Sequence, residues 1–551
     1  MVHSRVKQLS TPMVHETAFF RAICESPADD TARLVYSDWL EDRAGPGDLA
    51  RAEFIRLQIR LATMQPWHDE YDDLKRRERV LLNRYAEAWL EPVRPWLHPT
   101  FRLERDIALH GVFRRGFVET ILVDEQRFLA DPDGLFDAAP MTGLLFFVAS
   151  AALPTILESP HLSRIERLRF HNNVTHHASA EYQWVYLLRG DARRIAECPH
   201  LSNLRELDLT SQGTNPDGLE AIAHSPHLAN LERLTLAGRC IYSGGLEGFG
   251  RNLALPALRH LNLNQNPLMG PTGVWNGLSW LRRLHTLDLG LCEIAADEMA
   301  TFLASSPWPE LESLTLGTSG PFPFRGLGPV VSAMPRLAHL SLAGSMVPNL
   351  TDAFAGARFE AVVSLDLKQA APALNATTFF ETIAFPRLRV LNLFDVHLED
   401  GLAAFARTPT AIGLRSLDVR NTHTGHDEHA AFARTARLPN LRSLALGQSR
   451  GNLTPRVVRE LGTAEGLPGL RSLTLPLSAS ANVWRAVAEM PLLRQLDHLC
   501  IQGRVMSQQL VSLLTETPGF QGPLTLRLQF RAFSAEGRRR LRDHFGDRLL
   551  R

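Results

Sequence analysis

The sequence has very little lysine and no excess of charge of either sign. Only three of its 59 lysine and arginine residues are lysine, and they are balanced by 59 aspartate and glutamate residues. A formal net charge of zero at pH 7 produces no global field that would draw the chain to polyanions. The composition therefore argues against strong nonspecific nucleic-acid binding.

Long apolar runs and paired cysteines are also missing. No stretch approaches the roughly 18 apolar residues that a membrane helix needs, and the first twenty residues lack the apolar core of a secretion signal. The five cysteines are far apart and form no CxxC pair, which argues against a disulfide framework or a zinc ribbon. We therefore expect a cytoplasmic protein without membrane attachment.

Common catalytic motifs are absent as well. The sequence contains no GxxxxGK[ST], HExxH or GxSxG pattern, and the glycines of residues 244–250 lack the GxGxxG spacing of a phosphate loop. These absences predict a noncatalytic chain that needs no cofactor.

A repeat organises most of the chain. At 551 residues the chain exceeds the roughly 250 to 300 residues of a single core, so internal periodicity matters first. A pattern close to LxxLxL recurs every 25 to 29 residues, starting at Leu204, Leu231, Leu258, Leu284, Leu311, Leu337, Val362, Leu388, Leu414, Leu441, Leu470 and Leu496. A degenerate unit at Ile165 precedes these repeats, and a strand-like segment from Pro523 follows them.

These units resemble the leucine-rich repeat family, in particular its long, helix-containing class similar to ribonuclease inhibitor. Two units carry the full LxxLxLxx(N/C)xL pattern, with Asn266 and Cys292 at the turn position. Other units place different residues there, so the asparagine ladder of ideal repeats is largely missing. The resemblance implies an α/β solenoid, a horseshoe with a parallel sheet on its concave face and helices outside.

Elementary packing gives the same expectation. The leucines of one short strand point inward, neighbouring strands stack at about 4.8 Å, and apolar-periodic segments such as residues 296–309 return the chain as helices. One coil cannot bury its leucines alone, so both ends of the array need covers.

The N-terminal third breaks the period. Residues 16–62 read as two or three helices, and a further amphipathic helix is expected over residues 69–90. DDTARLVYSDWLEDRAG followed by RAEFIRLQ resembles the bacterial repeat-companion domain, a small helical module for which no chemistry is implied. The matching positions are Asp30, Arg33, Leu34, Tyr36, Asp38, Trp39, Leu40, Glu41, Arg51, Ala52, Glu53, Phe54, Ile55, Leu57 and Gln58.

The carboxylates of this module invite two interpretations. They could hold a metal or act as acid and base, but no histidine or second acidic cluster lies at ligand spacing within the module. A structural role is favoured, with the acidic residues paired to Arg33, Arg43 and Arg51.

The expected organisation has four parts. Residues 1–100 form the all-α companion domain and its following helix, and residues 101–164 form irregular entry coils with early strands. Residues 165–530 form the repeat array, and residues 531–551 form a C-terminal capping helix.

One histidine cluster is a weak metal candidate. His423, His426 and His429 recur every third residue and could chelate Zn²⁺ if they shared one helix face. The segment is expected instead to be a polar loop between a strand and its outer helix.

The concave face of the expected sheet supplies the candidate binding residues. The third, fifth and seventh residues of each LxxLxL unit face this side, and the fifth column up to Cys500 is polar, acidic or small, with no lysine or arginine. Such a mildly electronegative surface suits a basic or backbone-donating partner segment, although a solvated sheet tolerates the same residues. The candidates are Asp208, His260, Asn262, Asp288, His339, Asp366, Lys368, Asn392, Phe394, Asp418 and Arg420.

Three functional hypotheses follow. The first is a protein-recognition scaffold that binds a protein or peptide on the concave face, with oligomeric state open. The second is a regulatory or recruiting subunit of a bacterial enzyme assembly, such as a stress or defence system. The third is catalysis, either at the histidine cluster or as a GTPase-activating protein, an activity that the leucine-rich repeat resemblance includes.

Overall fold

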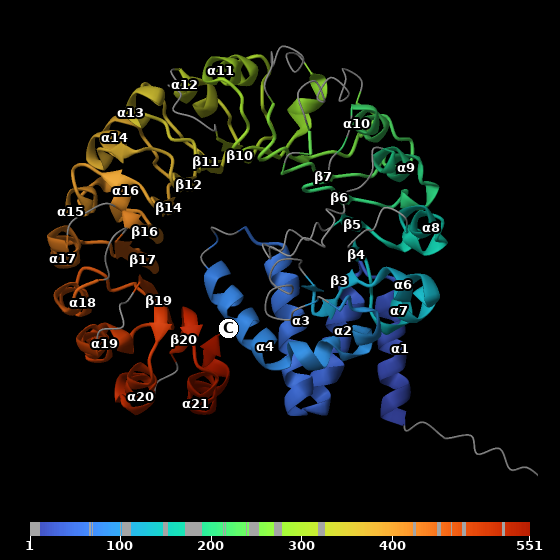
Figure 1. The fold of residues 1–551 in the computed structure, drawn as a ribbon, viewed down its shortest axis with the longest axis horizontal. Coiled ribbons are helices and arrows are strands. Elements are labelled where there is room, and N and C mark those ends of the chain that lie inside the picture. Colours follow the sequence, from blue (N-terminus) through green and yellow to red (C-terminus); the bar gives the residue numbers. More distant parts are fainter. Residues whose placement is uncertain are drawn as a thin grey trace, which may run out of the picture. The chain divides into compact units, whose positions relative to one another are not determined.

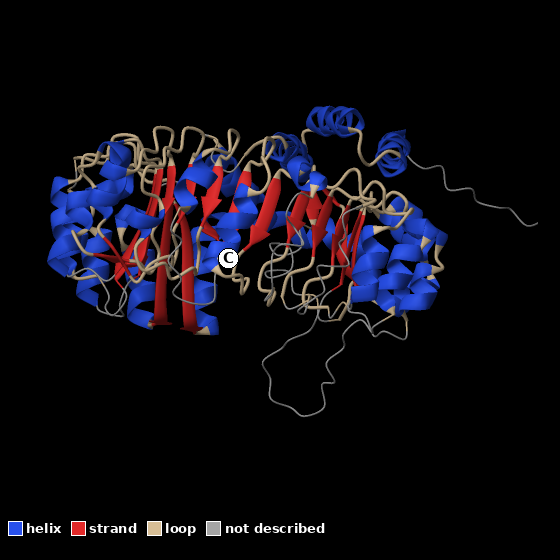
Figure 2. Ribbon diagram, turned by 90° about the horizontal axis from the view of Figure 1, so that it is seen from above, coloured by secondary structure: helices blue, strands red, loops and turns tan. Residues whose placement is uncertain are grey.

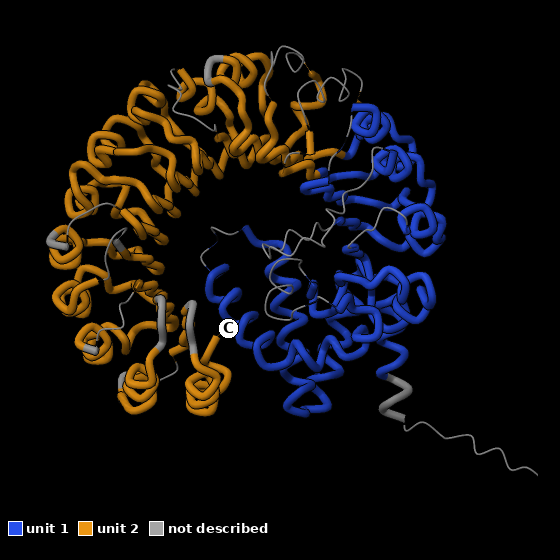
Figure 3. Tube along the Cα trace, in the orientation of Figure 1, with its two compact units in different colours: residues 1–234, 254–257 blue, residues 235–253, 258–551 orange. Residues whose placement is uncertain are grey.

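A computed structural model of the chain describes most of its length in two compact units. It describes residues 11–65, 68, 70–99, 101, 112–146, 152–170, 190–212, 214, 216–238, 240–241, 253–268, 278–317, 326–422, 426–448, 453–463, 465–476, 481–520 and 524–550. Unit 1 comprises Met1–Leu234 with Ala254–Ala257, and unit 2 comprises Thr235–Leu253 with Leu258–Arg551 (Figure 3). The four-part division expected from the sequence remains a prediction.

Unit 1 begins with a helical module. Its elements are α1 (Thr11–Glu25), α2 (Asp30–Arg43), α3 (Pro46–Ala62), α4 (Tyr71–Leu90) and the 3-10 helix η1 (Glu91–Trp96). The carboxylate of Asp29 caps α2 by accepting the N–H of Thr31 at 2.8 Å. Ala44 then turns the chain with a left-handed φ of 54°, and Pro46 opens α3 at a position where its missing N–H costs nothing. These signals place α2 and α3 as consecutive paired helices, in agreement with the sequence prediction.

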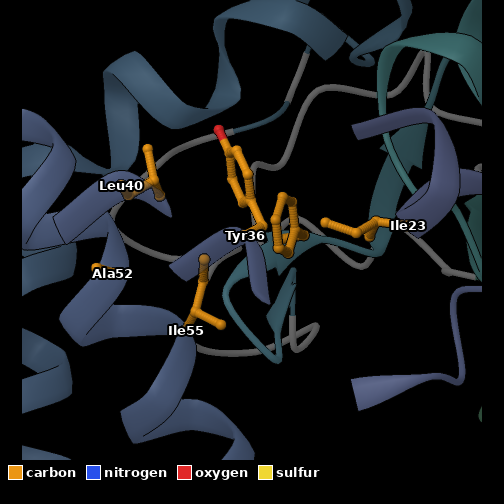
Figure 4. Close-up of a cluster of buried hydrophobic side chains, with 6 residues drawn as sticks. Ile23, Tyr36, Leu40, Ala52 and Ile55 are labelled. Atoms are coloured by element: carbon orange, nitrogen blue, oxygen red, sulfur yellow. The ribbon is translucent and has the colours of Figure 1, made fainter. Parts of the chain in front are cut away.

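The core of this module includes a strand residue from the start of the coils. Ile23, Tyr36, Leu40, Ala52 and Ile55 form a buried cluster (Figure 4). Phe117 completes the cluster, and it belongs to β2 (Phe117–Val118), which pairs antiparallel with β1 (Phe113–Arg114). The helical module and this hairpin therefore share one core.

Polar contacts hold the hairpin on α3. Arg115 and Gly116 form its turn with φ of 47° and 89°, and a Cβ on Gly116 would lie 2.2 Å from Cγ1 of Ile55. Only glycine allows this approach at this backbone conformation. The buried Gln58 accepts the N–H of Gly116 at 2.8 Å and donates to the carbonyl of Phe113 at 3.2 Å.

A buried ion pair joins the module to the first coils. Nη2 of Arg33 lies 2.8 Å from Oε1 of Glu119, and both side chains are fully buried. Arg115 and Arg167 also lie within 3.2 Å of this carboxylate, and the hydroxyl of Thr142 donates to it. One buried glutamate thus compensates the fully buried Arg33 and two partly exposed arginines beside it.

The sequence prediction of the ion partners was wrong in its particulars. Arg33 pairs with Glu119, which lies outside the module, and Arg51 has its guanidinium over the rings of Trp89 and Phe117. Spacing along one helix cannot reveal such partners, because they arrive from segments distant in sequence.

Several other carboxylates of the module are paired near the surface. Asp38 and Glu41 both bind Arg56, Arg43 binds Glu16 and Asp48, and Glu53 binds Arg77. This agrees with a structural role for these groups.

The rest of unit 1 is a parallel sheet with helices on its outer side. β3, β4, β5 and β6 pair in sequence order, and β7 (Arg233–Thr235) contains the division between the units. The bounds are β3 (Thr120–Val123), α6 (Glu125–Ala130), α7 (Pro132–Ala138), β4 (Gly143–Phe146), α8 (Leu153–Leu157), η2 (Pro160–Arg164), β5 (Arg167–Phe170), α9 (Asp191–Glu197), η3 (Pro199–Leu201), β6 (Glu206–Asp208) and α10 (Pro216–Ala223).

Unit 2 continues the same plan of inner strands and outer helices (Figure 1). Its strands are β8 (His260–Asn262), β9 (Thr286–Leu289), β10 (Ser313–Leu316), β11 (His339–Ser341), β12 (Ser364–Asp366), β14 (Val390–Asn392), β16 (Ser416–Thr422), β17 (Ser443–Gln448), β18 (Ser472–Pro476), β19 (His498–Met506), β20 (Thr525–Phe533) and β21 (Leu549–Leu550). A separate two-stranded sheet pairs β13 (Ala373–Leu374) with β15 (His397–Leu398).

Helices and 3-10 turns connect these strands (Figure 2). They are η6 (Ser279–Arg283), α11 (Ala296–Ala304), α12 (Leu327–Ser332), α13 (Leu350–Ala353), α14 (Ala376–Thr382), α15 (Leu402–Phe405), α16 (Pro409–Ile412), α17 (His426–Thr435), α18 (Pro455–Gly462), α19 (Ala481–Ala488), η7 (Pro491–Arg494), α20 (Gln508–Glu516), η8 (Pro518–Phe520), α21 (Ala535–Phe545) and η9 (Gly546–Arg548). None of the helices in the described part is both long and apolar enough to cross a bilayer.

The repeat pattern sets the strand register. His339, Leu340 and Ser341 pair with Ser364, Leu365 and Asp366, so equivalent positions of successive coils stand side by side. The leucines of the pattern are buried throughout, while third- and fifth-position residues alternate to the other face of the sheet. The sequence prediction of an α/β solenoid with a preceding helical segment is confirmed.

The C-terminal end adds a strand that the sequence analysis missed. Helix α21 follows β20, and the chain then returns as β21, which pairs parallel with β20. Two residues are too short a segment for a strand pattern to be recognised in the sequence.

The buried charge cluster gives a test of how the module is attached. We expect Glu119→Gln to lower the free energy of unfolding by about 3 kcal/mol, because Arg33 would keep its charge without a counter-ion. The matched variant Glu53→Gln breaks an exposed pair with Arg77 and should cost less than about 1 kcal/mol. Urea denaturation followed by tryptophan fluorescence measures both, and equal losses would contradict the role assigned to Glu119.

Candidate functional site

The open part of the sheet lies in unit 2. In unit 1 the fifth positions of β3 and β4 are Leu122 and Leu145, which are buried. Asp208 follows on β6, where it is 8% exposed and its Oδ2 lies 2.7 Å from Nε of Arg169. Asp208 is therefore occupied within unit 1, and the other ten candidates all belong to unit 2.

Fifth-position side chains have a structural task that the sequence analysis did not foresee. Seven of them end their strand by accepting the backbone N–H of the seventh residue, as Asp366 does from Lys368 at 3.0 Å. The same bond is made by Asp208, Asn262, Asp288, Ser341, Asn392 and Asp418. The column is polar because the strand ends need acceptors.

The residue after this bond takes a left-handed conformation in most coils. Positive φ occurs at Ser211, Gly238, Gln265, Leu291, Gly344, Gln369, Asp395 and Asn421, the eighth position of each unit. The strand end is therefore a repeated turn in which a short polar side chain fixes one N–H and the next backbone reverses.

At the turn position of the repeat pattern, several coils place a side chain that donates a hydrogen bond to a backbone carbonyl of the preceding coil. Nδ2 of Asn266 donates to the carbonyl of Leu236 in the preceding coil at 2.7 Å. Sγ of Cys292 and Oγ of Ser345 donate to the equivalent carbonyls, those of Leu263 and Leu316. Burial raises the pKa of the Cys292 thiol to about 12, which keeps it protonated for this role.

The candidate histidines contact the next coil. Nδ1 of His260 lies 3.0 Å from the hydroxyl of Thr286, and Nδ1 of His339 lies 2.9 Å from that of Ser364. Burial lowers the pKa of His339, while the nearby carboxylates of Asp366 and Asp288 oppose this effect. These rings therefore pack along the sheet as half-buried members of the surface.

One aromatic ring with cations on two sides occupies the middle of this face. Lys368, Phe394 and Arg420 are the seventh residues of neighbouring coils, and their coils pair through β12, β14 and β16. Nζ of Lys368 and Cζ of Arg420 each lie 5.4 Å from the centroid of Phe394. These distances are within the range of cation–π attraction.

Arg420 is held in place at both ends of its guanidinium. Nη2 and Nε donate to the carboxylate of Asp418 at 2.6 and 3.0 Å, and Nη1 donates to Oε1 of Gln502 at 3.4 Å. The bonds to Asp418 raise the pKa of Arg420. On the neighbouring strand, a Cβ on Gly447 would lie 2.5 Å from Cγ of Pro476, so glycine allows β17 and β18 to approach closely there.

The histidine cluster lies at the start of α17. His423 lies outside the described residues, and the side chain of His426 is also not described, while His429 is buried in α17. The expected loop is corrected here, because residues 426–435 are helical. Among the described residues, no group of three or more histidine, cysteine, aspartate or glutamate side chains is arranged to hold a metal.

The environment of Asp288 gives a second test. Burial raises the pKa of Asp288, against the opposing bonds from Gly290 and Asn264. A carboxyl whose folded pKa exceeds its unfolded value loses stability as the pH rises from that unfolded value through the folded one. We therefore expect Asp288→Asn to raise the free energy of unfolding at neutral pH, with the gain fading below about pH 4. Asn262 and Asn392 already make the same cap, so the fold accepts asparagine. Denaturation at several pH values would measure this, and a neutral-pH loss would contradict it.

The solved structures that match this chain include chains of two complexes, both at low identity. No protein-family model and no curated protein matches the chain. A chain of the Toll–Spatzle complex from Drosophila is 15% identical, with 71% of this chain and 54% of that chain covered and a TM-score of 0.35. A chain of the yeast Rad7–Elc1 complex is 15% identical, with 64% of this chain and 83% of that chain covered and a TM-score of 0.36. This chain thus spans about half of the first neighbour's length. Its own strand pairing and leucine triplets define an α/β solenoid of leucine-rich coils.

Proposed function

We propose that the chain is a noncatalytic scaffold that binds a protein or peptide on the concave sheet of unit 2. The observation that carries this proposal is the half-buried ring of Phe394, which lies between the cations of Lys368 and Arg420. Aromatic and arginine side chains dominate the binding energy of most protein interfaces. A ring flanked by two cations suits a partner that offers an apolar side chain beside an acidic group.

The surroundings of Phe394 support a flat contact surface. Its strand neighbours at the fifth position are Asp366, Asn392 and Asp418, all short side chains that are bonded to their own backbone. Short, fixed side chains leave the sheet accessible and lose little entropy when a partner binds. Large curved surfaces of repeat proteins serve chiefly as binding platforms.

Charge on this face is more mixed than the sequence indicates. The carboxylate of Asp418 is neutralised by Arg420, burial disfavours the charged form of Asp288, and Asp366 accepts the N–H of Lys368. The exposed ammonium of Lys368 is therefore the charge that an acidic group of the partner would meet. The proposal thus shifts the recognition role from the aspartates to the row of Lys368, Phe394 and Arg420.

Substitution of the ring tests the proposal. We expect Phe394→Ala to weaken binding of a partner about tenfold or more, because an interface anchor contributes about 2 kcal/mol. The partner would first be captured with the full chain from its own host, identified by mass spectrometry and then titrated against purified variants by calorimetry. Thr315→Ala, at a fifth position on β10, is the matched control and should bind as the unaltered chain does.

The charge contribution is separated by a milder pair of variants. Lys368→Gln should weaken the binding of an acidic partner, because it removes the exposed positive charge. Asp366→Asn should leave binding unchanged, because asparagine can still accept the backbone N–H of Lys368. If the affinity of the partner is unchanged by both Phe394→Ala and Lys368→Gln, the assignment of the concave face as the binding surface is wrong.

A further inference from the structure

A second surface of unit 2 carries four arginines at one repeat position. Arg389, Arg415, Arg442 and Arg471 are the second residues of four successive coils, just before β14, β16, β17 and β18. The strands of these coils are neighbours in the sheet, so the four residues follow one another at about 4.8 Å per strand. We call this set the arginine column.

The backbone fixes the column. The carbonyl of Arg389 accepts the N–H groups of Arg415 and Ser416 at 2.8 and 3.0 Å. The carbonyls of Arg415 and Arg442 each accept the two equivalent N–H groups of the next coil. The main-chain carbonyls here are therefore used inside the array, and what remains for a partner is the side chains.

Two guanidinium groups are also held by their own coils. Nη1 of Arg389 donates to the carbonyl of Leu388 at 2.8 Å, and Nη1 of Arg471 donates to the carbonyl of Leu470 at 3.0 Å. Gly413 lies beside Arg389, where a Cβ would come 3.2 Å from Nη1. A guanidinium fixed by one N–H presents its other donors at little entropic cost.

Three of the four arginines, Arg389, Arg442 and Arg471, lack the carboxylate partners found at the same repeat position in unit 1. In unit 1 the second residues are Glu166, Arg205 and Glu232, and Arg205 lies 3.9 Å from Glu166 and also pairs with Glu232 at 2.5 Å. Among the described residues, no carboxylate lies within ion-pair distance of Arg389, Arg442 or Arg471. The pKa of Arg415 is lowered, first by burial and then by the charge of Arg442. Like charges on neighbouring strands repel, so this arrangement costs stability in the isolated chain.

The column has clear limits and few stacking groups. Val363 precedes it and Asp497 follows it at the same repeat position. The exposed residues before its strands include Ile412, Pro439 and Pro468, which are apolar without a π face. Single-stranded nucleic acid is bound by aromatic platforms beside the cations, whereas an acidic peptide needs cations and aliphatic contacts.

We propose that the arginine column binds an acidic segment of a protein partner, with aspartate or glutamate carboxylates on Arg389, Arg415, Arg442 and Arg471. The surface lies at the opposite ends of the strands from Lys368, Phe394 and Arg420, about five residues or roughly 16 Å along the chain. This proposal goes beyond the function of the concave face, and its test does not depend on that function.

Titration with a model peptide tests this. Purified full chain is mixed with a fluorescein-labelled oligo-glutamate at low salt, and anisotropy gives the affinity. The unaltered chain should bind with an affinity that falls as salt rises, and Arg442→Gln with Arg471→Gln should weaken binding about tenfold or more. The matched pair Arg205→Gln with Arg259→Gln removes two charges at the same repeat position outside the column and should change affinity less than about twofold.

Other results would overturn the proposal. These are absence of binding to the unaltered chain, equal loss in both double variants, or tighter binding of an oligothymidylate of equal charge. Arg442→Gln alone, at an exposed side chain, should weaken binding in the same direction and guards against misfolding of the double variant. Phe394→Ala should leave oligo-glutamate binding unchanged, which separates this result from the concave-face function.

Discussion

The burial of leucines between successive coils is the constraint on which the rest of the structure depends. A strand of three or four residues has too few contacts to be stable alone, and its leucines are covered only when the next strand stands in register beside it. This register places equivalent residues of neighbouring coils side by side. Every column of side chains on the sheet is a consequence, including the aromatic row and the arginine column.

Stacking also creates a problem at each strand end, where the backbone must turn without leaving an N–H unsatisfied. In seven coils the fifth residue accepts the N–H of the seventh, and in most coils the eighth residue reverses the chain direction with a left-handed φ. The same short side chains that make the sheet look receptive are therefore needed by the fold. Side chains that do not cap a strand end, such as those of Lys368 and Phe394, are better candidates for partner recognition.

The helical module shows how an end of stacked coils can be closed. Its core takes in Phe117, its buried Gln58 binds the hairpin turn, and its Arg33 reaches Glu119 beside the first long strand. Arg33, Gln58 and Ile55 are among the residues that resemble the companion-domain pattern. In this chain they contact the coils, which gives that pattern a structural meaning.

The sequence by itself determined the solenoid, the strand positions and the helical start, because leucine spacing and helix caps are local signals that tertiary contacts reinforce. It also pointed to the residues of the concave face, since alternation along a strand assigns each side chain to one side. Only the tertiary structure decided which of these residues are available. Asp208 pairs with Arg169, the carboxylate of Asp418 is neutralised by Arg420, and Arg33 pairs with a glutamate far along the chain. Those pairings depend on distances across strands and segments, and they separate these paired charges from Arg389, Arg442 and Arg471, which have no carboxylate within ion-pair distance among the described residues.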